Sequence, residues 1–345
     1  MRGETVDHRR RMLAASLAAA SLAALAPHAR AQAVRTLKIS HQFPGGTIDE
    51  GDFRDRLVRK FAQDVEKRTK GSLKFEIYPA ASLMKAVPQY KAMVTGALDL
   101  SLYPLAYAGG EFPEANLTLM PALITSYEQG LRWKSAPIGR ELTRLVEERG
   151  LKIVTWVWQA GGIASKAKPV IQPDDVKGMK VRGGSRLIDL MTRSAGAAVT
   201  NVPSNEIYSA MQSGVLDAAV TSSTSLISFR LYETGKYLTA GRDHTFWFMF
   251  EPLMMSKKVF DGLTPDQQKA IVEAGAALEK FGMEAARADD QRVVEVYTKA
   301  GCKVSDMDAA AFAKWREVAR ASAWKDFAEK VKNGQQLLDM AAAVK

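Results

Sequence analysis

Apolar and polar residues alternate over several short stretches of this chain, and helical repeats separate those stretches. Residues Leu37–Phe43 alternate as in a half-buried strand, and residues 73–77 do the same. Between them, apolar side chains recur at the spacing of one helix face at Phe53, Leu57, Phe61 and Val65. Gly71 follows as a helix stop signal. The pattern therefore predicts a strand, a helix and a second strand in succession.

The same alternation continues along the chain. We expect further helices at Gln89–Val94, Ser126–Arg149, Leu187–Ser194 and Asn205–Ser213. We expect strands at Leu98–Leu102, Lys152–Trp158, Met179–Arg182 and Val215–Thr221. Strands that alternate with helices are typical of α/β proteins. The predicted fold class is α/β, with mixed, mostly parallel sheets.

One internal similarity supports a division into two related lobes. The segments Tyr90–Asp99 and Tyr208–Asp217 carry the same residue at six of ten positions. Each is predicted to be the end of a helix, a glycine turn and the start of a strand. A match of this length also arises from common helix–turn–strand chemistry, so it supports two lobes without proving them.

The C-terminal third is predicted to be helical. Thr264 and Pro265 form a helix N-cap and first-turn pair, and Gln267 completes a capping box. No strong helix breaker follows before Gly301, so we expect a helix to Ala300. Such a helix of about 36 residues would be roughly 54 Å long at 1.5 Å per residue. We therefore expect a long C-terminal brace helix that lies across both lobes.

The N-terminal residues have the composition of an export signal. Three arginines, Arg9–Arg11, precede an apolar run from Met12 to Ala26, and Ala29–Ala31 form a small-residue cleavage site. The run is shorter than the about 20 residues that cross a membrane. We predict a signal peptide over residues 1–31, with twin-arginine and general secretion both open as routes. The mature protein is expected in the periplasm and is not expected to span the membrane. The alternative is a membrane anchor or a buried N-terminal helix.

Composition excludes several kinds of chemistry. Cys302 is the only cysteine, so a disulfide within the monomer and a cysteine-based zinc site are ruled out. Four histidines are present, and only His41 and His244 follow the signal. We therefore predict no metal site and no cofactor. The net charge is +10, but acidic residues are interspersed among the basic ones, so a nucleic-acid partner is not expected.

Motifs for catalysis are absent from the sequence. It contains no G-x-S-x-G, H-E-x-x-H, phosphate loop or dinucleotide G-x-G-x-x-G. A Ser–His–Asp triad would have to use His41 or His244, and nothing places either beside a nucleophile. Asp174 and Asp175 follow Pro173 and indicate a helix start. Glycine pairs are interpreted as turns at strand ends at 45–46, 109–110, 161–162 and 183–184. These observations favour binding over catalysis.

At the segment Gly178–Gly183 the chain resembles the periplasmic solute receptors of TRAP (tripartite ATP-independent periplasmic) transporters, of the dicarboxylate-receptor or DctP type. The resemblance covers nearly all of the mature chain. It is carried by the order and spacing of Phe75–Pro79, Gly96–Asp99, Asp174–Arg182, Pro203–Asp217, Met255–Phe260 and Leu263–Gln268. It implies a two-lobed periplasmic binding protein, similar to type II, that is not an enzyme. Such a receptor binds an organic acid anion between its lobes and delivers it to TRAP membrane permease subunits.

The resemblance also implies a division of the chain. Lobe I would comprise residues 32–157 plus about 245–285, and lobe II residues 158–244 plus about 286–345. Two alternatives stay open for the function. One is a binding protein for an ATP-driven (ABC) transporter or a sensor system, and the other is an exported organic-acid enzyme on the same scaffold.

Arg182 is the main candidate for a ligand contact. In the receptors that the chain resembles, the arginine of the K-x-R segment pairs with the ligand carboxylate, and this position is Arg182. A guanidinium can bind a carboxylate through two parallel hydrogen bonds and keeps its charge when water leaves. The alternative for Arg182 is a structural ion pair.

Further candidates are taken from the expected ends of strands, where ligands bind in open α/β sheets. These are Gln42, Tyr103, Trp158, Thr221 and Ser222, with Trp247 as a possible wall of the site. Packing is the alternative role for the tryptophans, and turn chemistry for Thr221. Some of the similar receptors carry a second arginine where this chain has Gln159–Ile163. With one arginine, hydroxyls and aromatic residues, we expect a monocarboxylate ligand such as a hydroxy, keto or aromatic acid.

Overall fold

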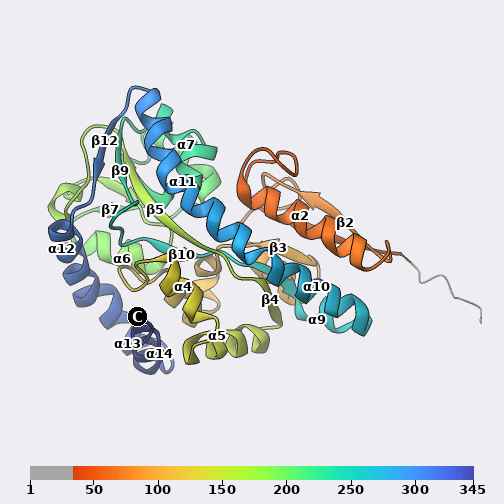
Figure 1. The fold of residues 1–345 in the computed structure, drawn as a ribbon. Coiled ribbons are helices and arrows are strands. Elements are labelled where there is room, and N and C mark those ends of the chain that lie inside the picture. The colour runs from red at the N-terminus through yellow and green to blue at the C-terminus, as the bar shows by residue number, and fades with distance from the viewer. Residues whose placement is uncertain (1–33) are drawn as a thin grey trace, which may run out of the picture. The chain divides into compact units, whose positions relative to one another are not determined.

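The computed structural model describes residues 34–345 of the chain. These residues form two mixed β-sheets with helices on their faces (Figure 1). The predicted signal peptide at residues 1–31 lies outside this range. Residues 35–345 form one compact unit. None of the helices in this described part is long and apolar enough to cross a membrane.

The first sheet has five strands in the order β2-β1-β3-β11-β4. Their bounds are Leu73–Tyr78, Arg35–Ser40, Leu100–Leu102, Leu253–Ser256 and Leu151–Thr155. Strand β11 runs antiparallel to both of its neighbours, whereas β1, β2 and β3 are parallel. The helices that pack on this sheet or beside it are α2 (Phe53–Arg68), α3 (Gln89–Thr95), α5 (Pro137–Glu148), α9 (Lys257–Asp261) and α10 (Pro265–Ala277).

The second sheet has the order β12-β9-β5-β8-β6-β7, and β10 also pairs with β5. The bounds in that order are Lys303–Asp306, Tyr237–Ala240, Trp158–Ser165, Ala218–Ser222, Lys180–Arg182 and Ala198–Val199, with β10 at Phe248–Phe250. Strand β5 runs against its partners β8, β9 and β10. Nearby helices are α6 (Arg186–Ser194), α7 (Ile207–Gln212) and α8 (Ser223–Ser228). In each sheet a single described strand is reversed, so the prediction of mixed, mostly parallel sheets is confirmed.

The chain passes between the two sheets at two short crossings. One is Trp156–Val157, between β4 and β5, and the other is Glu251–Pro252, between β10 and β11. Glu251 N donates a hydrogen bond to Val157 O at 2.9 Å, so the two crossings lie side by side. The two-lobed α/β architecture predicted from the sequence is confirmed.

Local sequence rules account for many element ends. Asp52 caps α2 by accepting a hydrogen bond from Arg54 N. Gly96 ends α3 in the left-handed conformation, with φ of 77°, which glycine adopts without steric cost. The capping box of Thr264 and Gln267 is present at the start of α10. The expected start at Asp174–Asp175 is a short 3-10 helix, η4 (Pro173–Val176).

Both long helices predicted from the sequence are interrupted. Residues 126–149 form α4 (Tyr127–Trp133) and α5, because Pro137 cannot continue a helix and instead occupies the first turn of α5. Residues 264–300 form α10 and α11 (Glu279–Lys299), with Leu278 between them. Helix α11 packs against α2 as well as α8, β5, β9 and β12, and it runs across the middle of the view in Figure 1. The brace is therefore present, but its 21 residues are roughly 31 Å long and not 54 Å.

The strand predicted at Lys152–Trp158 is also interrupted, because the crossing at residues 156–157 divides it. The apolar run had suggested that Trp158 ends a strand. In the structure, Trp158 begins β5. Gly161 and Gly162 lie inside β5 and not at a turn. A Cβ on Gly161 would lie 2.4 Å from Thr221 O, so glycine is needed there for close strand packing.

The C-terminal helices extend back to the first sheet. After α12 (Ala309–Ala319) and a π-helical turn, α13 (Lys325–Lys330) and α14 (Gly334–Ala342) follow. Helix α14 packs on α5, and Trp324 Nε1 donates a hydrogen bond to Pro121 O at 2.9 Å. The lobe bounds given above remain a prediction, and this packing favours assigning the last residues to lobe I.

Candidate functional site

The ends of several strands from both sheets meet at the crossings. In the first sheet, Ser40 pairs with Ser101 in parallel register, and Gln42 and Tyr103 follow just beyond the ends of β1 and β3. In the second sheet, β6 ends at Arg182 and β8 ends at Ser222, where β5 begins. This arrangement explains why polar residues from distant parts of the sequence gather here.

Arg182 is almost completely buried, with 1% of its surface exposed. Its guanidinium donates three hydrogen bonds to neutral oxygens. Nε donates to Val202 O at 2.9 Å, Nη1 to Val220 O at 2.8 Å and Nη2 to Tyr107 Oη at 2.9 Å. No carboxylate within residues 34–345 forms an ion pair with it. Because a guanidinium has five N–H groups, one N–H on each terminal nitrogen is left for a further acceptor.

Gly184 gives the guanidinium its room. Its φ of 90° is a left-handed conformation that favours glycine. A Cβ at this position would lie 2.5 Å from Arg182 Nη1 and 2.8 Å from Cζ. The Gly183–Gly184 turn predicted from the sequence is therefore in place, and it covers one face of the arginine. The nearby Asp189 accepts a hydrogen bond from Gly183 N at 2.9 Å, and burial raises the pKa of its carboxyl to about 6.

Two tyrosines connect Arg182 to the first sheet. Tyr107 lies in the 3-10 helix η2 (Leu105–Gly110), and its hydroxyl also accepts a hydrogen bond from Ser204 N at 3.0 Å. The Tyr107 ring lies 6.1 Å from the Tyr103 ring, measured between centroids, at an edge-to-face angle. Tyr103 is buried, which raises the pKa of its hydroxyl, and that hydroxyl donates to Val87 O at 3.2 Å.

Trp247 contacts the turn that follows Arg182, and its expected role as a wall of the site stays a prediction. Its Nε1 donates a hydrogen bond to Gly183 O at 3.0 Å. Its ring packs on the backbone of β5, because a Cβ on Gly161 would lie 2.4 Å from Trp247 Cε3. The tryptophan therefore bridges the arginine turn and the start of β5.

Gln159 and Glu251 complete a closed series of contacts. Gln159 lies two residues before Gly161 in β5, and its Nε2 donates a hydrogen bond to Glu251 Oε2. Glu251 precedes Pro252, whose carbonyl accepts a hydrogen bond from Tyr103 N at 3.0 Å. Three of the links run through the backbone of chain neighbours, namely Gly183, Gly161 and Pro252. We call the six linked residues the contact ring: Tyr103, Tyr107, Arg182, Trp247, Gln159 and Glu251.

Several polar atoms at the contact ring are buried without a partner among the described residues. They are Gln159 Oε1 and Glu251 Oε1. Both amide atoms of Gln42, which follows β1, are also buried without a partner. Buried polar groups are almost always hydrogen-bonded in folded proteins, so unpaired groups that lie together mark a place for a bound molecule or water. Burial also raises the pKa of Glu251 to about 7, and Arg54 lowers it in part.

Three of the sequence candidates have structural contacts of their own, and their role in ligand binding stays a prediction. Trp158 packs among aromatic rings, with Trp133 at 5.2 Å and Phe250 at 5.0 Å between centroids, on the strand face opposite to Gln159. Ser222 caps α8, because its Oγ accepts a hydrogen bond from Ser225 N at 3.1 Å. Thr221 is buried in β8 opposite Gly162. The structure thus links Arg182, Tyr103 and Trp247 through Tyr107 and Gly183, places Gln42 just beyond the end of β1, and leaves Trp158 in the hydrophobic core.

The sequence interpretation missed Tyr107, Gln159 and Glu251 as members of the site. Gln159 entered the sequence analysis only as the first residue of a segment in which some similar receptors carry a second arginine. Its position at the start of β5, next to a crossing, becomes visible only once the strand boundary is known. Tyr107 lies in a loop with no regular pattern, and Glu251 lies 92 residues from the glutamine that it contacts.

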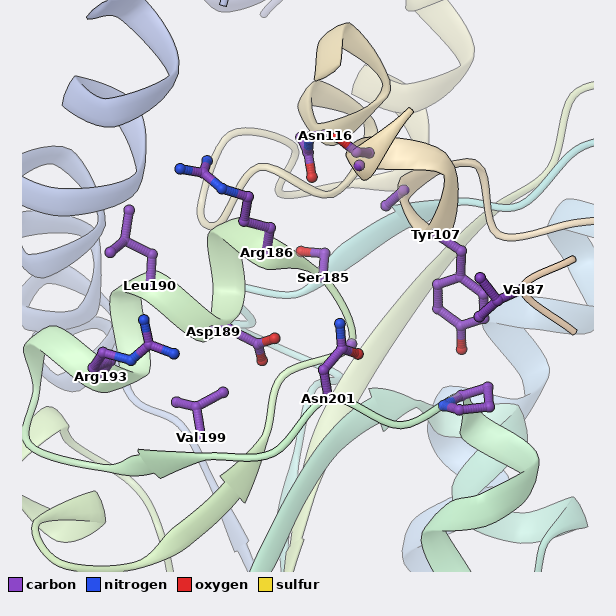
Figure 2. A pocket seen from close by; sticks show the side chains of 15 residues that line it. Val87, Tyr107, Asn116, Ser185, Arg186, Asp189, Leu190, Arg193, Val199 and Asn201 are labelled. Atoms are coloured by element: carbon purple, nitrogen blue, oxygen red, sulfur yellow. Dashed lines mark hydrogen bonds between the residues drawn. The ribbon is translucent and has the colours of Figure 1, made fainter. Parts of the chain in front are cut away.

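A cavity of about 530 Å³ lies next to the contact ring (Figure 2). Tyr107 and Gly184, which both lie against Arg182, line this cavity, but Arg182 itself does not. In Figure 2, Tyr107 and Asn116 approach from one side, and Asp189 of α6 and Ser185, which caps that helix, from the other. Its volume lies within the range of small-molecule pockets, about 300–1,000 Å³.

A second arginine, Arg54, is fully buried behind the contact ring. Its guanidinium bonds Asp52 at 2.7 and 2.9 Å and Glu251 at 3.3 Å, and it lies 3.6 Å from the centre of the Phe43 ring. It also donates to Ser225 Oγ at 3.1 Å. Arg54 therefore joins α2 to α8 and, through Glu251, to one of the crossings. In contrast to Arg182, it has two carboxylate partners.

No group of histidine, cysteine, aspartate and glutamate side chains within residues 34–345 is placed to hold a metal ion. Cys302 is a free, partly buried cysteine far along the chain from the contact ring.

Two lobes joined by paired crossings, with a buried arginine at the strand ends between them, define a two-lobed solute-binding protein. The comparisons with known proteins agree. The model of bacterial extracellular solute-binding protein family 7 (DctP) matches residues 47–330, and the chain belongs to this family. Its members are extracytoplasmic solute receptors and not enzymes.

Similar proteins of this family have been described. A solute-binding protein of Albidiferax ferrireducens is 59% identical over 305 residues, which cover 88% of this chain and 90% of that protein. A TRAP periplasmic solute-binding protein from Rhodoferax ferrireducens, crystallised with bound malonate, is 58% identical with a TM-score of 0.88 and covers 89% of this chain and 98% of that chain. The 2,3-diketo-L-gulonate-binding periplasmic protein YiaO of Escherichia coli is 25% identical over 78% of this chain and 82% of that protein.

Proposed function

We propose that the contact ring binds the carboxylate of an organic acid, and that Arg182 is the residue that pairs with it. The observation that carries this proposal is a buried guanidinium with neutral partners and two remaining N–H groups. Arg182 interacts electrostatically with Asp189, but no carboxylate of residues 34–345 is bonded to the guanidinium. A ligand carboxylate would supply a directly bonded counter-ion together with two parallel hydrogen bonds. Tyr103, Gln42 and Trp247 are proposed to contact the rest of the ligand.

The relatives support the class of ligand. The Rhodoferax protein holds malonate, and the Escherichia coli protein is named for a sugar-derived acid. The sequence had suggested a monocarboxylate. Malonate, a dicarboxylate, is bound by a protein 58% identical to this one and speaks against that restriction. The proposed ligand is therefore a small organic acid with at least one carboxylate.

The receptor is proposed to deliver this acid to the membrane subunits of a TRAP permease, the partnership that is typical of its family. A receptor of this kind captures its solute between the lobes and releases it at the permease. The proposal predicts that deleting this gene abolishes uptake of the acid by cells that carry the matching permease, while an ABC transporter inhibitor has no effect.

Thermal unfolding in the presence of a few hundred organic acids tests the ligand class. A ligand at 100 times its dissociation constant adds about 2.7 kcal/mol of stability, which raises the melting temperature by several degrees. Hits confined to carboxylates, and lost in Arg182→Ala, are the expected result. Arg242→Ala is a suitable control, because Arg242 pairs with Asp306 on the surface at 2.7 Å. Equal stabilisation of Arg182→Ala and the wild type would contradict the proposed role.

A further inference from the structure

Asp189 is the one acidic residue among the described residues that line the cavity beside the contact ring. The other charged lining residues are Arg186 and Arg193, which belong to the same helix, α6. In Figure 2 the Asp189 carboxyl group points toward Asn201, which lines the cavity as well. An anion that enters this cavity therefore meets a single carboxyl group among positive charges.

The carboxyl group of Asp189 is held next to Arg182. Its Oδ1 accepts a hydrogen bond from Gly183 N at 2.9 Å, and Gly183 directly follows Arg182 in the chain. A Cβ on Gly183 would lie 2.7 Å from Asp189 Oδ1, so the missing side chain lets the carboxyl group approach the turn. Asp189 is 7% exposed. Solvent therefore screens its charge from its neighbours only weakly.

Two arginines act on this carboxyl group. Burial raises the pKa of Asp189 to about 6, and the Gly183 hydrogen bond and the positive charges of Arg182 and Arg193 limit that rise. Arg182 comes from β6 and Arg193 from α6 itself. The ionised form of Asp189 thus depends in part on the charge of the residue that is proposed to bind the ligand.

The elements that pack against α6 carry further charged groups, and none of these shifts the pKa of Asp189. Arg186 is paired with Asp326 at 2.5 Å. The others are Lys180 on β6, Glu114 on the 3-10 helix η3 (Pro113–Leu119), Lys314, Arg316 and Glu317 on α12, and Arg320 on the π-helical turn. Within the described part of the chain, Arg182 and Arg193 are therefore the charges that control Asp189.

A bound acid changes the charge around Asp189. In the proposed function, the carboxylate of the acid pairs with Arg182 and neutralises a positive charge that favours the ionised carboxyl group. The negative charge of the acid also disfavours a second negative charge nearby. Both effects favour the protonated form of Asp189. The acid and a proton therefore strengthen each other's binding, because such coupling is reciprocal.

Building on the proposed function, we infer that Asp189 makes the receptor take up a proton together with the acid, so that its affinity for the acid falls as the pH rises from acidic to neutral. The proton comes from the solvent and binds Oδ2, because Oδ1 accepts from Gly183 N. At acidic pH the carboxyl group is already protonated and does not oppose the acid. At neutral pH the free receptor carries an ionised Asp189, which repels the acid until it gains a proton.

The variant Asp189→Asn tests this coupling. Its amide keeps an oxygen that accepts from Gly183 N and cannot become negatively charged. Malonate and pyruvate are titrated into the whole purified protein by calorimetry at about pH 5 and about pH 7.5, on either side of the Asp189 titration. The affinity of the variant relative to the wild type should rise about fivefold or more between these pH values, a typical size for coupling between two sites. A relative affinity that does not rise with pH would overturn the inference, because a merely structural role weakens binding equally at both.

The number of protons is measured separately, from the binding heats in two buffers of different ionisation enthalpy at about pH 6.5. The wild type should take up a larger fraction of a proton than Asp189→Asn. Glu251 and the acids themselves also titrate in this range, but they are common to all the proteins compared, so their contribution cancels. Equal uptake by the wild type and Asp189→Asn would contradict the assignment.

Asp290→Asn is the matched control. Burial raises the pKa of Asp290 to about 6 as well, but Asp290 lies in α11, accepts a hydrogen bond from Tyr127 Oη at 2.7 Å and does not line this cavity. This variant should take up as many protons as the wild type. Loss of uptake in Asp290→Asn alone would assign the proton to Asp290 and overturn the role of Asp189.

The two proposals fail in different ways. Acids that bind through Arg182 with the same proton uptake in the wild type and Asp189→Asn would refute the coupling and leave the receptor function standing. Absence of binding by malonate, pyruvate and every acid of the thermal screen would refute the proposed carboxylate site itself.

Discussion

Arg182 and Tyr107 follow strands of different sheets, and a hydrogen bond of 2.9 Å from Arg182 Nη2 to Tyr107 Oη joins them. The same hydroxyl accepts from Ser204 N at 3.0 Å. The residue proposed to bind the ligand carboxylate is therefore itself held by the opposite lobe. The proposed ligand binding and the contact between the lobes would therefore share one guanidinium.

Tyr107→Phe is expected to weaken ligand binding by about ten- to a hundredfold. The variant leaves one guanidinium N–H and Ser204 N without a partner, and a hydrogen bond to a charged group contributes about 1.5–3 kcal/mol. Calorimetric titration with an acid identified in the screen measures the change. Tyr78→Phe is the control, because its hydroxyl bonds Glu76 on the surface at 2.8 Å, and no loss of affinity is expected there. Equal losses in both variants would contradict the special role of Tyr107.

Gly184→Ala is expected to reduce ligand affinity at least about tenfold, because the new Cβ would displace the Arg182 guanidinium from its place 2.5 Å away. Gly178→Ala separates this effect from backbone strain. Gly178 has a similar positive φ of 74°, and a Cβ there would meet nothing within 4 Å. Both variants should lose about 1 kcal/mol of stability from the left-handed backbone. Only Gly184→Ala should bind the acid less tightly, and unchanged affinity would show that Arg182 tolerates the displacement.

Arg54→Leu is expected to lower the free energy of unfolding by about 3–5 kcal/mol. The variant leaves Asp52 and Glu251 buried without their cation, which is the costly way to break a buried ion pair. Arg68→Leu on the same helix is the control, because its pairs with Asp64 and Glu273 are exposed and contribute about 0–1 kcal/mol. Urea unfolding of both variants provides the comparison. Similar losses would mean that Arg54 acts no differently from a surface arginine.

The stability of the wild type should decrease relative to Glu251→Gln as the pH rises from 4.5 to about 7. Burial raises the pKa of Glu251 from 4.5 to about 7, so in this interval the folded protein holds a proton that the unfolded chain releases. Folding is therefore favoured by this group at the acidic end and disfavoured above the folded pKa. Urea unfolding at a series of pH values measures the difference. Parallel stability curves for the two proteins would show that Glu251 titrates normally.

The sequence was a good guide to the fold and a partial guide to the site. Strand and helix periods located most elements, and the K-x-R segment located Arg182. The apolar run from Leu151 to Trp158 reads as one strand, because nothing in a buried sequence marks the point where the chain crosses between lobes. The helix break at Pro137 carried a visible signal, whereas the break at Leu278 did not.

The remaining site residues could not be found from one sequence, because their partners are distant. Arg54 and Glu251 are separated by 197 residues, and their charges look like ordinary surface charges along the chain. Gln159 gains its role from a contact with Glu251 and from the strand face that it occupies. Such pairings depend on the order of strands in the sheets, which the spacing of apolar residues does not specify.

Strand β11 stands between β3 and β4 in the first sheet, although it is made about a hundred residues after β4. Until residues 253–256 have left the ribosome, β4 has no neighbouring strand and β3 keeps an open edge. Contacts of such long range are slow to form, and open strand edges promote aggregation of nascent chains. The strand order therefore means that the first sheet cannot be completed before most of the second lobe has been made.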